Sequence, residues 1–79
     1  MISRAAQDAA DNIWLPVAAS RSNGLYAAHR LEIAAYEFFG AGLYAEGEDK
    51  DFFYWLADTA RELSACSDDR PALLRRQAA

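Results

Sequence analysis

Along most of this chain, apolar residues recur at the spacing that places them on one face of an α-helix. The first such stretch covers residues 3–15. Pro16 lacks a backbone N–H and clashes with the preceding turn, so we expect this helix to end or kink near Trp14. Its apolar and polar faces carry Ile2, Ala6, Ala9, Ala10, Ile13 and Trp14 on one side and Arg4, Gln7, Asp8 and Asp11 on the other.

A second helix is predicted over residues 25–39, with Ser22 or Asn23 as its N-cap. The segment contains no glycine or proline, and its apolar arc is broad, which is typical of a helix at the centre of a bundle or at an oligomer contact. Gly40 and Gly42 supply a stop signal, because glycine readily adopts the left-handed conformation after a helix. The residues expected to face inward are Ala28, Leu31, Ala35, Phe38 and Phe39.

A third helix is predicted over residues 52–66, with Asp49 or Asp51 as its N-cap. Its expected inner stripe is Phe52, Leu56, Thr59, Leu63 and Cys66, flanked by Trp55 and Ala60, with Tyr54, Asp58, Arg61 and Glu62 outside. Pro71 is well placed to begin a short C-terminal helix over residues 71–77. We therefore expect an all-α fold, a small bundle of three main helices and a short fourth, in a single domain spanning residues 1–79.

Composition narrows the class of protein. The chain has 79 residues, of which 53% are hydrophobic and 25% charged, as in a globular domain. A domain of this size buries only about 60% of its unfolded surface, so a partner or a homodimer through the second helix would add needed stability. The formal net charge of −4 argues against direct nucleic-acid binding and favours a protein partner with a basic surface.

The expected location is the cytoplasm. Cys66 is the only cysteine, so no internal disulfide can form. The first twelve residues lack the continuous apolar run of a signal peptide, and no apolar run approaches the roughly 20 residues of a membrane span.

Residues 33–63 resemble the bacterial family catalogued as domain of unknown function 2934. The matching residues are Ile33, Ala35, Tyr36 and Glu37, then Gly42 and Gly47 in a turn, then Trp55-Leu56 and Arg61-Glu62-Leu63. The resemblance covers about two fifths of the chain. It implies a helical hairpin and no particular activity.

Candidate catalytic and metal-binding residues are few. His29 is the only histidine, and although Glu32 lies one turn later, no second histidine or thiolate stands at ligand spacing. Cys66 is expected to be a small buried residue, because a helix C-terminus disfavours a thiolate. The acids of residues 46–51 lack the alternating ligands of a calcium-binding EF-hand loop. We expect no cofactor, no metal and no enzymatic activity.

The acidic segment has two interpretations. It is a solvated loop whose last acid caps a helix, or its carboxylates and neighbouring tyrosines bind another protein, with aromatic anchors giving affinity and charge giving steering. The candidate partner-binding residues are Tyr44, Glu46, Glu48, Asp49, Asp51, Tyr54 and Asp58.

The favoured hypothesis is a non-enzymatic acidic interaction module. By analogy of size and charge, it would be a phage or mobile-element inhibitor, similar to anti-CRISPR proteins, that occludes a nucleic-acid-binding partner. The alternative is a structural or regulatory helical-hairpin domain in a bacterial assembly.

Overall fold

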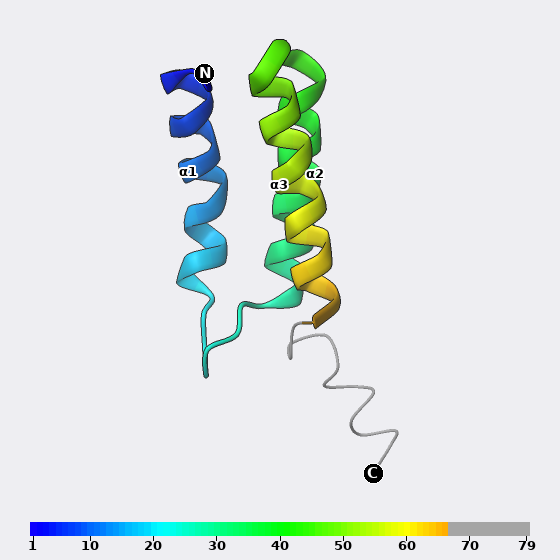
Figure 1. The fold of residues 1–79 in the computed structure, drawn as a ribbon. Coiled ribbons are helices and arrows are strands. Elements are labelled where there is room, and N and C mark those ends of the chain that lie inside the picture. Colours follow the sequence, from blue (N-terminus) through cyan, green and yellow to red (C-terminus); the bar gives the residue numbers. More distant parts are fainter. Residues whose placement is uncertain (67–79) are drawn as a thin grey trace.

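Three α-helices make up the fold in the computed structural model, which describes residues 1–66: α1 (Arg4–Ala19), α2 (Ala28–Tyr44) and α3 (Gly47–Cys66). α2 and α3 pack along their lengths as an antiparallel hairpin, and α1 runs beside them in the same direction as α3 (Figure 1). The all-α prediction is confirmed. The short helix predicted over residues 71–77 lies outside the described residues.

The core between these helices is built mainly from small side chains. Phe38, Leu31 and Val17 are the largest side chains that are almost completely buried. Alanine dominates the rest, so the helices can approach one another closely. The core cluster consists of Ala6, Ala10, Val17, Leu31, Ala34, Ala35, Phe38, Phe53, Ala57 and Ala60.

α1 extends beyond the predicted range of residues 3–15 and continues through Pro16 to Ala19. Pro16 is exposed, so the carbonyl of Asn12, which loses its helical partner there, lies on the solvent side and can bind water. The next residue, Val17, is 1% exposed. Burying this side chain contributes about 1.5–3 kcal/mol, which offsets most of the cost of about 3 kcal/mol for an internal proline.

The connection between α1 and α2 contains a tight turn. Ser22 and Leu25 exchange both backbone hydrogen bonds, at 2.8 and 3.0 Å, across Asn23 and Gly24. These two central residues have φ angles of 54° and 80°, the backbone that Asn-Gly pairs favour. Ser22 and Asn23 therefore form a turn and do not cap α2, which begins three residues later than predicted, at Ala28.

Ser20 ties the two ends of this connection together. Its hydroxyl donates to the carbonyl of Val17 at 2.6 Å and accepts from the backbone N–H of Ala27, the N-cap of α2, at 3.1 Å. One side chain thus satisfies a backbone group at the end of α1 and another at the start of α2.

The predicted stop at Gly40 and Gly42 is also wrong, because both lie inside α2, which ends at Tyr44. Neither has a positive φ; between α2 and α3 the positive φ belongs to Gly47, at 59°, where α3 begins after a two-residue turn. Gly42 is instead a point of close approach. A Cβ atom there would lie 2.6 Å from Cε1 and 2.8 Å from Cδ1 of Tyr54.

α3 begins five residues earlier than predicted, and its inner face is shifted by one position. The buried residues are Phe53, Ala57, Ala60 and Ser64, each one position after a residue of the predicted stripe. Phe52 and Leu56 are half-buried, and the other members of the predicted stripe and its flank include three exposed residues, Trp55, Leu63 and Cys66. Apart from Phe53, the residues that α3 buries are small, whereas the predicted stripe included the larger Leu56 and Leu63.

The two internal glycines of α2 should respond oppositely to alanine. Gly42→Ala forces the Tyr54 ring away from its contact with Phe39, whose ring centroid is 5.5 Å away, and we expect a loss of about 1–3 kcal/mol in the free energy of unfolding. Gly40→Ala meets no atom within 4 Å and should gain about 0.5–1 kcal/mol from helix propensity. Urea unfolding at dilute protein measures both. Equal effects of the two substitutions would contradict the close approach at Gly42.

Candidate functional site

The seven predicted partner-binding residues do not form one loop. Tyr44 is the last residue of α2 and is 92% exposed, while Glu46 is exposed in the turn between α2 and α3. The other five belong to α3, where they lie on different sides of the helix: Glu48, Asp49, Asp51, Tyr54 and Asp58. Most of the predicted acidic loop is thus the first turns of α3, where carboxylates interact favourably with the helix dipole.

Asp49 has a structural role that links α3 to the start of α1. Its two carboxylate oxygens accept hydrogen bonds from the backbone N–H of Ser3, at 2.8 Å, and from the Ser3 hydroxyl, at 2.7 Å. The same hydroxyl accepts from the N–H of Ala6 at 3.1 Å and so caps α1. The backbone and hydroxyl hydrogen bonds from Ser3 hold the pKa of Asp49 below its ordinary value.

Tyr54 is not an outward-facing residue as predicted, but is half-buried against α2. Its ring lies against Phe39 and Gly42, and Lys50 covers it, with Nζ 5.1 Å from the ring centroid. Lys50 Nζ also donates to the carbonyl of Gly42 at 2.8 Å, near the C-terminus of α2. The only lysine of the chain is therefore engaged between the helices.

The remaining acids of α3 line one exposed face around Trp55. Trp55 follows Glu48 by seven residues and Asp51 by four, and it precedes Asp58 by three and Glu62 by seven. This spacing puts all five side chains on one side of a helix. Trp55 is 62% exposed. We call these five residues the acidic face of α3.

Few cations balance the acidic face. Glu48 pairs with the amino group of Met1, and Arg61 approaches Asp58 with 3.9 Å between Nη1 and Oδ1. Two cations thus stand beside four carboxylates, so the acidic face keeps a net negative charge. The sequence pattern did not predict that Trp55 is exposed, since it placed this residue beside the inner stripe of the helix. The spacing of the small residues Ala57, Ala60 and Ser64 would have indicated it.

An apolar groove lies between α1 and α3, next to the acidic face. Its volume is about 360 Å³. Phe38 of α2 contributes to it, and the half-buried Phe52 and Leu56 and the exposed Leu63 line the α3 side. The groove exists because α1 packs mainly on α2 and touches α3 over a much shorter stretch. The lining residues are Ala10, Asp11, Trp14, Phe38, Phe52, Leu56, Thr59, Ala60 and Leu63.

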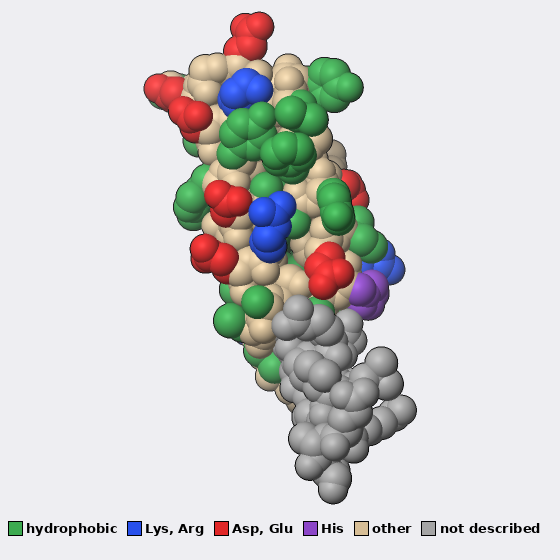
Figure 2. Space-filling view, turned by 90° about the vertical axis from the view of Figure 1, so that its right-hand side faces the viewer, with side chains coloured by type: hydrophobic (Ala, Val, Ile, Leu, Met, Phe, Trp, Pro, Cys, Tyr) green, Lys and Arg blue, Asp and Glu red, His purple; other side chains and the backbone are tan. Residues whose placement is uncertain are grey.

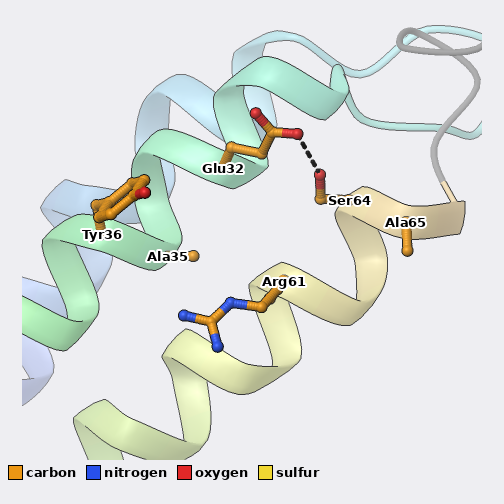
Figure 3. A pocket seen from close by; sticks show the side chains of 6 residues that line it. All are labelled: Glu32, Ala35, Tyr36, Arg61, Ser64 and Ala65. Carbon is orange, nitrogen blue, oxygen red and sulfur yellow. Dashed lines mark hydrogen bonds between the residues drawn. The ribbon is translucent and has the colours of Figure 1, made fainter.

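A second, more polar pocket of about 330 Å³ opens between α2 and α3 (Figure 3). Ser64 Oγ lies 3.3 Å from Glu32 Oε1 and 3.4 Å from the carbonyl of Ala28, and Arg61 and Tyr36 line the opposite part of the pocket. A serine nucleophile needs a base that is itself held by a third group. Ser64 here links the two helices by long hydrogen bonds, which indicates a structural polar contact.

The other candidate residues lie apart from these surfaces. His29 is exposed in the first turn of α2, and Cys66 is exposed at the last residue of α3, where a buried position was predicted. Within residues 1–66, no three histidine, cysteine or acidic side chains come close enough to hold a metal ion. None of the helices in this range combines the length and apolar character that crossing a membrane requires.

Comparison with protein-family models, curated proteins and solved structures gave no match for this chain. The resemblance of residues 33–63 to the domain of unknown function 2934 therefore stays a prediction. The surfaces described above are the basis on which a function can be proposed.

Replacing Asp49 by asparagine should loosen the start of α1. The variant keeps one acceptor for Ser3 but loses the charge, so we expect faster hydrogen exchange of the amides in the first turn of α1. Asp51→Asn, an exposed neighbour on the same helix, is the matched control and should leave these rates unchanged.

The same contact sets an acid dependence. Because the pKa of Asp49 is lowered in the folded protein, its contribution to stability is complete above the ordinary aspartate value of about 3.9 and is lost as the pH falls through the lowered value. In Asp49→Asn, this part of the acid destabilisation should be missing. An identical pH dependence of the two proteins would show that the Ser3 contact does not couple α1 to α3.

Proposed function

We propose that the protein is a non-enzymatic interaction module that binds a basic surface of another protein through the acidic face of α3. One observation carries the proposal: a tryptophan that is 62% exposed lies among four carboxylates on a single helix face. Tryptophan is among the residues that most often dominate the binding energy of an interface. A large exposed aromatic side chain does not serve the core, so a binding role accounts for its position.

The parts of this surface have different roles in binding. The carboxylates attract a positively charged partner over a distance set by the ionic strength, which raises the association rate. Trp55 then provides the buried contact area that slows dissociation. The neighbouring groove between α1 and α3 can accept an apolar side chain of the partner, because Phe52, Leu56 and Leu63 line its floor and edge. We expect the partner to present an apolar side chain beside lysines and arginines.

Proteins that bind nucleic acid through rows of lysine and arginine carry such surfaces. An acidic helix on one of these surfaces would occlude the phosphate-binding site, and the protein would act as an inhibitor in the manner of anti-CRISPR proteins. A structural or regulatory role in a bacterial assembly is the alternative, in which the partner would still bind its other ligands. Competition between this protein and a nucleic acid for the purified partner distinguishes the two.

The contribution of Trp55 can be tested with a matched pair of variants. Trp55→Ala should weaken binding to a partner captured from bacterial lysate and then purified, by about tenfold or more, because an anchor residue is lost. Leu15→Ala is the control, since Leu15 is 63% exposed but lies on α1. Isothermal titration calorimetry measures both affinities. Equal affinity of Trp55→Ala and the unsubstituted protein would remove the acidic face from the binding site.

The role of the charges can be tested separately through association rates. Asp51→Lys should slow association about three- to tenfold at low salt, and the difference should shrink as salt screens the charge. Asp8→Lys changes the net charge equally but lies on α1, so it should have a smaller effect. Stopped-flow kinetics across a salt series would contradict steering by the acidic face if the two variants behaved alike.

A further inference from the structure

The outer face of α2 is apolar although the helix packs on only two of its sides. Ile33 is 45%, Tyr36 80% and Leu43 55% exposed. Hydrophobic side chains run down the side of the molecule shown in Figure 2, between charged ones. Ile33, Tyr36 and Leu43 alternate with His29 and Gly40, so that positions 29, 33, 36, 40 and 43 are separated by four and three residues in turn. This is the spacing of a seam between two paired helices. We call the five residues the α2 seam.

Gly40 lies within this seam and has no evident role in the isolated chain. Its backbone is helical, and a Cβ atom would meet nothing within 4 Å. Glycine inside a helix costs roughly 0.5–1 kcal/mol of stability relative to alanine. At Gly42, two residues later, this cost has a reason, because the Tyr54 ring leaves no room for a Cβ atom. At Gly40 the described residues supply no such neighbour, so the seam has room for a side chain from outside.

Charges beside the seam identify a second copy as the occupant. Arg30 and Glu37 are both exposed and stand seven residues apart, which is two helical turns along the same flank of the seam. In an antiparallel pair related by a two-fold axis, equivalent flanks face each other. Arg30 then lies beside the partner's Glu37, and Glu37 beside the partner's Arg30. A parallel pair would leave these charges roughly 10 Å apart along the axis.

We propose that the α2 seam pairs antiparallel with the α2 seam of a second copy of this chain. The register that joins Arg30 to the partner's Glu37 also sets Ile33 beside the partner's Tyr36 and Gly40 beside the partner's His29. All of these contacts occur twice, as a two-fold interface requires. α1 and α3 occupy the other two sides of α2, so α2 becomes the central helix of the dimer and the acidic face of α3 stays open.

Charge reversal tests both the pairing and its direction. Arg30→Glu and Glu37→Arg each turn two attractive contacts into two repulsive ones, and each variant should dissociate at concentrations about tenfold or more above those of the unsubstituted dimer. An equimolar mixture of the two variants should associate, because one chain then carries a glutamate and the other an arginine at both pairs of facing positions. The double variant, with both charges exchanged, should dimerise like the unsubstituted chain.

Sedimentation equilibrium of the full chain measures the dissociation constants, and circular dichroism checks that each variant is folded. Trp55→Ala is the control that should leave dimerisation unchanged. An unsubstituted chain that stays monomeric at about 0.5 mM would overturn the proposal and leave the seam to a different protein. Single variants that dimerise as well as the unsubstituted chain, or a mixture that fails to associate, would equally overturn it.

Discussion

Small side chains meet along the buried side of the α2–α3 hairpin, and their size determines where the larger residues lie. Ala35 and Gly42 of α2 and Ala57 and Ala60 of α3 are all buried, which lets the two helices approach closely. This hairpin buries only Phe38 and Phe53 of its aromatic side chains. Phe39 and Tyr54 therefore pack at its edge, and Trp55 lies on the surface. The exposed surfaces of the protein are a consequence of how its core is built.

The attachment of α1 differs in kind from the hairpin. Its ends are fixed by hydrogen bonds, from Ser3 to Asp49 at one end and from Ala27 to Ser20 at the other. Between them it buries Ala6, Ala10 and Val17, and Trp14 makes an edge-to-face contact with Tyr26. Because α1 packs on α2 more than on α3, an apolar groove remains beside α3. The groove and the acidic face are neighbours for this reason.

The three main helices and most of the buried side of α2 could be predicted, because apolar residues recur there at helical spacing. Phe39 is the exception on α2: it was expected to face inward but is 46% exposed. Helix ends were harder. Pro16 and Gly40 normally interrupt helices, yet the burial of Val17 after Pro16 and of Gly42 after Gly40 overrides these local signals. The register of α3 was missed because Trp55 and Leu63 are more hydrophobic than Ala57 and Ser64. Ala57 and Ser64 are nevertheless the residues that α3 buries, because small side chains fit the close contact with α2. For the same reason the exposed tryptophan, which defines the candidate site, could not be found from apolar character alone.

The unequal packing of α1 also bears on how the fold moves. An element that packs mainly on one neighbour separates from the fold at a lower free energy than one packed along its whole length. α1 is thus the natural first unit to open, with the hairpin still intact. Such an opening would uncover Phe38, which is otherwise 1% exposed, and turn the short groove into a continuous apolar cleft along α2 and α3.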